Sequence, residues 1–417
     1  MVYLLNPTRV ILVFSLMLSV VVLPFGTGVG AQSVVPDYWP TNGWRTSDPE
    51  AQGMNSTLLD EMTAFIENGV ENLSWALHSF LVIRNGYIVY EYYSLPYDQD
   101  TLHFLASATK TFVAALIGIA LDAGIIGSIN DTVVDIFDDR PIANMDARKE
   151  AITIRHLLTM TPGLAWDNDN GYNIMIASPD WVQYVLDLPM IADPGETWAY
   201  NSGASHLLSA IIQQLSGTTT LAFAENRLFG PLGIDQYLWE TDPQGIPNGG
   251  AGMELTPRNM AKLGLLYLEN GQWDGQQLLP EDFVAASCTI QSHLTTDPDG
   301  NPASGYGYQT WVYPYLDAYG ARGSGGQRIL VVPDHELVIV TTGNDAQLVP
   351  LADLLLDYVY ASIYQSPALP LVPWQGVVLV ALVIGAPLAV GAIYLIRKFR
   401  FRKNSHKVLK EGEELEK

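Results

Sequence analysis

The stretch that decides the fold is Ser107-Ala108-Thr109-Lys110, which directly precedes the apolar run 112–123. A serine and a lysine three residues apart can share one face of the first turn of a helix. There the lysine amine can take the proton of the serine hydroxyl, which is a poor nucleophile until a neighbouring base activates it. Because this spacing also occurs by chance, the rest of the chain has to support a catalytic role.

Sequence before and behind this tetrapeptide predicts regular elements. Residues 55–68 have apolar side chains at helical spacing, with Asn55 or Ser56 as the N-cap. Residues 79–93 predict a β-hairpin, since two apolar stretches flank Asn85-Gly86, which suits a tight turn. The apolar run 112–123 predicts a buried helix that ends at Gly124.

The second half of the chain predicts helices first and strands later. Residues 130–300 are mostly helix and loop, including a helix through Asn270 with Thr256 as its N-cap and Pro257 as its first residue. Strands are expected at 307–313, 328–333 and 336–342, and a last helix at 349–363. We therefore predict an α/β fold of the α+β type, in which both ends of the chain form one antiparallel sheet with terminal helices packed on it and a helical lobe inserted.

Three more stretches suit the same chemistry. Residues 194–203, PGETWAYNSG, deliver Tyr200 to a loop before an apolar helix at 207–215. A tyrosine beside a lysine ammonium can have a lowered pKa and act as a general base. Residues 323–327, GSGGQ, lead into a strand, where glycines let backbone amides approach a substrate as oxyanion donors. The third stretch is ITIRHLLTMTPGL at 152–164.

Together these motifs resemble the serine beta-lactamase-related hydrolases, the family of class C beta-lactamases, D,D-peptidases and related esterases. The resemblance extends from about residue 45 to residue 363, and LTPRNMAKLG at 255–264 also resembles this family. Four matches in the expected order are far more specific than any single one. The resemblance implies the family's transpeptidase-like fold and an acyl-enzyme mechanism.

The resemblance also implies roles for the matching positions. Ser107 corresponds to the nucleophile, Lys110 to its proton acceptor and Tyr200 to the base of a Tyr-x-Asn element. Residues 324–326 stand in the place of a Lys-Thr-Gly or His-x-Gly strand motif. The oxyanion hole would use the backbone amides of Ser107 and Gln327.

Two positions depart from the family pattern. Ser202 stands where beta-lactam enzymes keep an asparagine, and Ser324 stands where a lysine or histidine is common. In the relatives those side chains help to hold an amide or a carboxylate. We therefore expect an uncharged subsite, which favours an esterase or amidase over a beta-lactamase or D,D-peptidase. The expected substrate- and oxyanion-binding residues are Ser202, Ser324, Gly325, Gly326 and Gln327.

Both ends of the chain are typical of export and membrane attachment. Arg9 precedes an apolar run at 10–23, and small residues follow up to Ala31, which predicts a signal peptide over 1–31. An uncleaved N-terminal anchor is the alternative. Residues 376–396 carry no charge and precede a basic cluster, which predicts a single membrane-spanning helix. We therefore predict an extracytoplasmic hydrolase domain over 32–365, a linker over 366–375 and a basic cytoplasmic tail over 397–417.

Composition excludes several partners. The chain has a net charge of −23 although both predicted targeting ends are positive, so its middle is too acidic to bind nucleic acid by charge. Cys288 is the only cysteine, which leaves no internal disulfide and no cysteine-based metal site. The histidines show no paired ligand spacing and no glycine-rich phosphate loop follows a strand. We expect neither a metal nor a cofactor.

The sequence thus predicts a membrane-anchored serine hydrolase that cleaves a small-molecule or peptide ester or amide through an acyl-enzyme on Ser107. Two alternatives remain open. One is a D,D-peptidase or beta-lactamase that acts on cell-wall peptides or beta-lactams. The other is a catalytically silent receptor that binds a peptide or acyl ligand on the same fold.

Overall fold

A computed structural model describes residues 38–71, 76–167, 170–294, 304–344 and 354–364. The predicted signal peptide, linker, membrane helix and cytoplasmic tail lie outside these ranges. Within them, no helix combines the length and the apolar character needed to cross a membrane.

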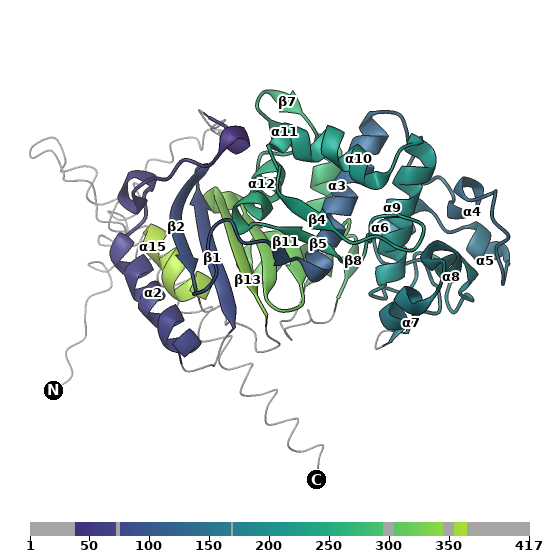
Figure 1. Ribbon diagram of the computed structural model, residues 1–417, viewed down its shortest axis with the longest axis horizontal. Helices are drawn as coiled ribbons and strands as arrows, with labels where there is room; N and C mark the ends of the chain where they lie inside the picture. The colour runs from purple at the N-terminus through teal and green to yellow at the C-terminus, as the bar shows by residue number, and fades with distance from the viewer. Residues whose placement is uncertain (1–37, 72–75, 168–169, 295–303, 345–353, 365–417) are drawn as a thin grey trace, which may run out of the picture. The chain divides into compact units, whose positions relative to one another are not determined.

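One antiparallel sheet of eight strands lies at the centre of the described region (Figure 1). Its order is β2-β1-β13-β12-β11-β10-β9-β8, so strands from the two ends of the domain meet where β1 pairs with β13. This confirms the predicted sheet. The strands are β1 (Leu77–Arg84), β2 (Tyr87–Tyr93), β8 (Ser292–His293), β9 (Gly305–Tyr306), β10 (Trp311–Tyr313), β11 (Ala318–Gly323), β12 (Gln327–Val332) and β13 (Leu337–Gly343).

The predicted hairpin at 79–93 is confirmed, but the strand predicted at 307–313 differs from the structure and β11 was not predicted. Asn85 and Gly86 turn between β1 and β2 with φ of 51° and 78°. Of the strand expected at 307–313 only 311–313 is strand (β10), because residues 307–310 form a bend in which Gln309 has φ 51°; the short strand β9 ends before this bend. β11 was not predicted, since its sequence AYGARG has two glycines and no β-branched residue.

Helices cover both faces of the sheet. On one face α12 (Pro257–Leu268) lies against β12 and β13, and Gly264 allows the close approach, since a Cβ there would lie 2.4 Å from Val338 Cγ1. On the other face α2 (Ser56–Glu71) packs with the C-terminal helical turns η7 (Leu355–Val359) and α15 (Tyr360–Tyr364) (Figure 1). Alternate side chains of β1 enter the two separate apolar clusters, as the period of a strand requires.

Two predicted helix starts are confirmed by their caps. The side chain of Asn55 accepts a hydrogen bond of 3.0 Å from the N–H of Thr57, one residue into α2. Thr256 Oγ1 accepts one of 3.2 Å from Asn259 N, and Pro257 opens α12 as predicted. Both arrangements satisfy N–H groups that a helix leaves without internal partners.

The inserted lobe is built around helix α9, which packs against α3 (Thr109–Asp122) and against α6, α8 and α10. Helix α9 begins at Ser202, five residues before the predicted start, directly behind the Tyr200 loop. The helices of the lobe are α4 (Val133–Ile136), α5 (Ala147–Glu150), α6 (Ile154–Leu158), α7 (Gly171–Ala177), α8 (Trp181–Asp187), α9 (Ser202–Ser216), α10 (Thr220–Ala224) and α11 (Gly230–Leu232), with a π turn η4 (Glu225–Phe229).

A small sheet of order β3-β5-β4 joins the lobe to the start of α3, and the sequence did not predict it. Its strands are β3 (His103–Phe104), β4 (Tyr237–Trp239) and β5 (Met253–Leu255). The remaining elements are β6 (Gln272–Trp273), β7 (Gln276–Gln277), α13 (Glu281–Cys288) and the 3₁₀ turns η1 (Pro40–Asn42), η2 (Pro49–Gln52), η3 (Ala106–Ala108), η5 (Pro314–Leu316) and η6 (Pro333–His335).

Candidate active site

Ser107 lies in the 3₁₀ turn η3, between β3 and helix α3. The residue before it, Ala106, has φ 46°, a left-handed conformation that costs free energy for any residue with a Cβ. The turn leaves Ser107 partly exposed while Ala106 and Ala108 are buried. A strained, tightly packed turn thus presents one hydroxyl at the surface.

Lys110 lies one turn further along, and its side chain is only 1% exposed. Its Nζ donates hydrogen bonds to Ser107 Oγ at 3.0 Å, to Ser202 Oγ at 3.1 Å and to the carbonyl oxygen of Gly250 at 2.6 Å. No acidic side chain is among these partners, so burial dominates and lowers the pKa of Lys110 from 10.5 to about 7. An amine with this pKa can accept a proton near neutral pH.

Tyr200 stands on the other side of Ser107, just before α9. Asn201 Oδ1 caps the helix by accepting a hydrogen bond of 2.9 Å from Ala204 N, which fixes the backbone next to Tyr200. The tyrosine hydroxyl makes a hydrogen bond with Ser107, and Lys110 Nζ lies 4.8 Å from the centre of the Tyr200 ring.

The expected lowered pKa of Tyr200 is not found. Burial raises the pKa of Tyr200 to about 12, although the hydrogen bond with Ser107 and the charge of Arg322 act in the opposite direction. Two causes explain the difference. Aromatic rings surround the phenol, and the nearby Lys110 is neutral for much of the time at neutral pH. Tyr200 is therefore a protonated phenol that can donate a proton, while Lys110 is the group able to accept one.

The ring of Tyr200 belongs to an aromatic cluster that sequence spacing alone does not reveal. It stacks on Trp311 of β10 with 6.0 Å between ring centres and 29° between planes. Trp198 and Tyr306 contact the same two rings edge-on or at a tilt. This packing supplies the low-polarity surroundings that raise the pKa of the phenol.

Residues 324–326, which the sequence analysis set in the place of the family's strand motif, lie at the end of the β11–β12 hairpin, and their role in substrate binding stays a prediction. These residues form the turn between β11 and β12, and Gly325 and Gly326 have φ of 81° and 89°, outside the range of a strand. Ser324 is exposed in this turn. The strand residue that reaches the Ser107 turn is instead Gly323, where an added Cβ would lie 2.1 Å from the carbonyl oxygen of Leu105.

Arg322, next to Gly323 on β11, is a cation that the sequence analysis did not consider, and the uncharged subsite stays a prediction. Its guanidinium carbon lies 5.8 Å from the centre of the Trp311 ring, and its charge lowers the pKa of Tyr200. The end of β11 therefore carries a cation near Trp311 and Tyr200, two residues before Ser324.

Gln327 opens β12 and pairs with Gly323 across the hairpin. Its side chain points to the end of β13, where Nε2 donates to the carbonyl oxygen of Gly343 at 2.5 Å and more weakly to that of Gly325 at 3.4 Å. The side chain thus braces the glycine turn. The proposed role of the backbone amides of Ser107 and Gln327 as oxyanion donors stays a prediction.

The structure therefore brings together Ser107, Lys110, Tyr200 and Ser202, and sets residues 324–326 in the neighbouring turn. It adds Gly250 and Arg322, which the sequence analysis missed. Gly250 acts through its backbone, and its only sequence signal is the glycine pair that precedes the family-like segment at 255–264. Among the described residues, no three His, Cys, Asp or Glu side chains cluster as a metal site would require.

Comparisons with known proteins show the family and the fold. A family model described as beta-lactamase matches residues 63–360. An uncharacterized protein of Alkalihalophilus pseudofirmus is 24% identical over 328 residues, which cover 70% of this chain and 90% of that protein. A putative 6-aminohexanoate-dimer hydrolase from Bacillus anthracis has a TM-score of 0.61 at 21% identity, with 73% of this chain and 82% of that chain covered. A family VIII carboxylesterase has a TM-score of 0.60 at 15% identity, with coverage of 76% and 98%.

Proposed function

The chain belongs to the beta-lactamase family of serine hydrolases, and we propose that it cleaves a small ester or amide through an acyl-enzyme on Ser107. The observation that carries the proposal is the contact of 3.0 Å between Ser107 Oγ and Lys110 Nζ. Burial lowers the pKa of this lysine to about 7. A hydroxyl beside a buried, partly neutral amine is the arrangement that general-base activation needs.

Acylation begins when neutral Lys110 takes the proton of Ser107 and Oγ bonds to the carbonyl carbon of the substrate. The electron pair of the carbonyl moves to its oxygen, which backbone N–H groups of Ser107 and of the β11–β12 hairpin would hold. One such donor stabilises the transition state by ~3 kcal/mol in acyl-transfer enzymes.

Tyr200 completes the reaction as the acid. Its protonated hydroxyl, already hydrogen-bonded to Ser107, gives a proton to the leaving oxygen or nitrogen as the tetrahedral intermediate collapses. The ammonium of Lys110 then returns a proton to the Tyr200 oxygen, which restores both groups. In deacylation neutral Lys110 takes a proton from water, whose oxygen bonds to the acyl carbon. As the bond to Ser107 Oγ breaks, Tyr200 gives its proton to Oγ, the ammonium of Lys110 restores the Tyr200 hydroxyl, and the acid is released.

The experiment compares the wild-type enzyme with Ser107→Ala on p-nitrophenyl butyrate and on an anilide of the same acid. We expect measurable hydrolysis of the ester by the wild type and a loss of at least 10³-fold in the variant. Equal rates for the two proteins would overturn the proposal. A fluorophosphonate probe that labels the wild type but not Ser107→Ala would exclude the silent-receptor alternative.

A D,D-peptidase or beta-lactamase activity is the second candidate, and Arg322 is the observation that favours it. A guanidinium whose charge reaches Tyr200 suits a substrate carboxylate, which beta-lactams and cell-wall peptides carry. Turnover of nitrocefin or stable labelling by a fluorescent penicillin at Ser107 would support this candidate over the esterase.

Membrane attachment remains a proposal based on the sequence of residues 1–31 and 376–396 alone. It predicts that the full chain sediments with membranes after expression. It also predicts that protease added outside the cell removes the hydrolase domain and leaves the tail 397–417 protected. Recovery of the intact full chain in the soluble fraction would contradict it.

A further inference from the structure

A buried loop that includes Asn248 and Gly250 contacts Lys110. Of the three hydrogen bonds that Lys110 Nζ makes, the one to the carbonyl oxygen of Gly250 in this loop is the shortest, at 2.6 Å. A carbonyl oxygen only accepts hydrogen bonds, so it always takes one N–H of Lys110. A neutral amine has two N–H groups and one lone pair. When Gly250 and Ser202 take the two N–H groups, the lone pair is left facing Ser107.

Asn248 holds the Gly250 peptide in place. Its Oδ1 accepts hydrogen bonds from Gly250 N at 3.0 Å and from Ala251 N at 3.1 Å. Its Nδ2 donates to the hydroxyl of Tyr172 at 2.8 Å. The residue is completely buried, and a buried amide with both ends bonded has one fixed orientation.

The backbone N–H and carbonyl groups of Asn248 also both make hydrogen bonds. Its N–H donates to the carbonyl of Glu240 at 2.8 Å, and its carbonyl accepts from Trp239 Nε1 at 3.0 Å. These contacts tie the loop to β4 and fix the position from which the Asn248 side chain reaches Gly250.

The loop then lies on the backbone of α9, and glycines make this possible. A Cβ on Gly249 would lie 2.2 Å from the carbonyl oxygen of Ser205, and one on Gly250 would lie 2.8 Å from that of Ser202. Substitution of either glycine would push the Gly250 carbonyl away from Lys110. The distance between loop and helix is therefore set by direct contact.

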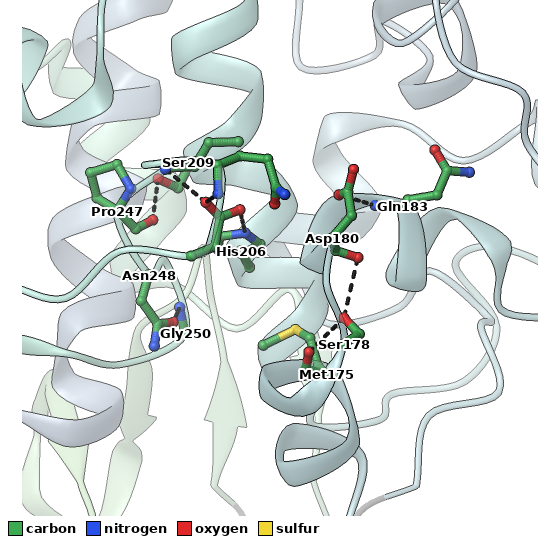
Figure 2. A network of polar contacts seen from close by, with 12 residues as sticks. Met175, Ser178, Asp180, Gln183, His206, Ser209, Pro247, Asn248 and Gly250 are labelled. Atoms are coloured by element: carbon green, nitrogen blue, oxygen red, sulfur yellow. Dashed lines mark hydrogen bonds and ion pairs between the residues drawn. The ribbon is translucent and has the colours of Figure 1, made fainter.

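Two further contacts anchor the loop to the same face of α9 (Figure 2). Ser209 Oγ donates to the carbonyl of Pro247 at 2.7 Å. His206 Nε2 lies 3.1 Å from Asp242 Oδ2, and both side chains are fully buried. Since Ser202, His206 and Ser209 are spaced four and three residues apart, they form one stripe on α9, along which the loop runs.

From these contacts we propose that Asn248 is a positioning residue, which aims the lone pair of Lys110 at Ser107 through the Gly250 carbonyl. The proposal rests on the proposed hydrolysis at Ser107. Asn248 does not touch the reacting atoms. Its effect is to keep an acceptor on one N–H of Lys110, so that the amine does not turn its N–H toward the serine hydroxyl.

The test compares Asn248→Ala with Ser209→Ala, a matched control that removes a buried hydrogen bond from the same loop without touching Gly250. Both variants should lower the melting temperature by a few degrees. We expect Asn248→Ala to lower kcat on p-nitrophenyl butyrate at least tenfold with KM within about twofold. Ser209→Ala should keep kcat within about twofold of the wild type. Similar kcat losses in the two variants would overturn the proposal.

A second variant, Asn248→Asp, keeps the acceptor oxygen and adds a negative charge near Lys110. Because an opposite charge favours the ammonium, the acid limb of the kcat–pH profile should move upward by about one unit, while kcat on the high-pH plateau stays above that of Asn248→Ala. An unmoved limb would overturn the proposal even if Asn248→Ala does not fold. Wild-type and Ser107→Ala enzymes are assayed in parallel. Without Ser107-dependent hydrolysis in the wild type both proposals fail, whereas with it only the positioning role is at stake.

Discussion

The two sides of the candidate site are built differently. On one side α3, α9 and the loop around Gly250 enclose Lys110, which is almost completely buried and has three defined partners. On the other side the end of β11 and its glycine turn present an exposed Ser324, with Arg322 and Trp311 alongside. The difference indicates that proton transfer depends on a rigid interior, whereas substrate choice depends on a strand edge that reaches the surface.

This comparison predicts that substitutions on the two sides change different kinetic constants. Changes at the Lys110 side should lower kcat with little effect on KM. Changes at the strand edge should change KM by different factors for substrates of different charge. They should leave kcat for a neutral ester nearly unchanged.

The largest effect is expected for Lys110→Met, which removes the base but keeps the volume of the side chain. We predict a loss of kcat of about 10³–10⁴-fold in ester hydrolysis. The variant should also be more stable than the wild type, by roughly 1–3 kcal/mol in urea unfolding.

The sign of this stability change follows from the pKa of Lys110. The unfolded chain keeps the ammonium up to its ordinary pKa of 10.5, while the folded chain releases the proton near pH 7. Wild-type stability therefore rises as pH increases from 7 to 10.5, and the gain in Lys110→Met is largest at or below pH 7. A variant less stable than the wild type at pH 6 would contradict the burial of an unpaired charge.

Tyr200→Phe should have the next largest effect, about 10²-fold in kcat, because it removes the acid but keeps the aromatic ring on Trp311. The loss should be larger for an anilide than for a nitrophenyl ester, whose leaving group hardly needs a proton. Stopped-flow measurement of both substrates tests this. Equal losses for the two leaving groups would argue against Tyr200 as the acid.

Ser202→Ala should lower kcat by about tenfold, since it removes one of the two acceptors that orient Lys110. Ser205→Ala is the matched control on the same helix, because Ser205 donates to Gln309 at 2.7 Å and makes no contact with Lys110. The kcat of this control should change less than twofold. The reverse order of the two effects would show that Ser202 does not act through Lys110.

The smallest effect on kcat, with a clear effect on KM, is predicted for Arg322→Gln at the strand edge. For esters that carry a free carboxylate KM should rise by about tenfold, and for a neutral ester of the same acyl group KM should change less than twofold. Steady-state kinetics on this pair of substrates is the measurement. Equal changes for both esters would show that Arg322 does not bind the substrate carboxylate and that the strand edge does not set substrate choice.

The parts of this site that the sequence predicted are those set by local geometry or by side-chain type. The spacing of Ser107 and Lys110 places both on one helical turn, and the capped starts of α2 and α12 follow equally local rules. The hairpin at Asn85 follows from the φ that its turn requires.

The parts that the sequence missed depend on tertiary packing. Gly250 contributes a carbonyl oxygen, which every residue has, so only the fold shows that it faces Lys110. Residues 324–326 were expected at the edge of a strand, and the φ values of Gly325 and Gly326 place them in the turn that the pairing of β11 with β12 creates. The pKa of Tyr200 rises because aromatic rings from β9 and β10, more than 100 residues away, enclose it.

The most direct test of the central claim is the pH dependence of the rate at which a fluorophosphonate probe labels Ser107, followed by mass spectrometry of the labelled peptide. Because neutral Lys110 must take the serine proton, the rate should increase about tenfold between pH 6 and pH 8, with a midpoint near 7. The increase should disappear in Lys110→Met. A midpoint near 10.5, or a rate independent of pH in the wild type, would contradict the claim that a buried, neutral lysine activates Ser107.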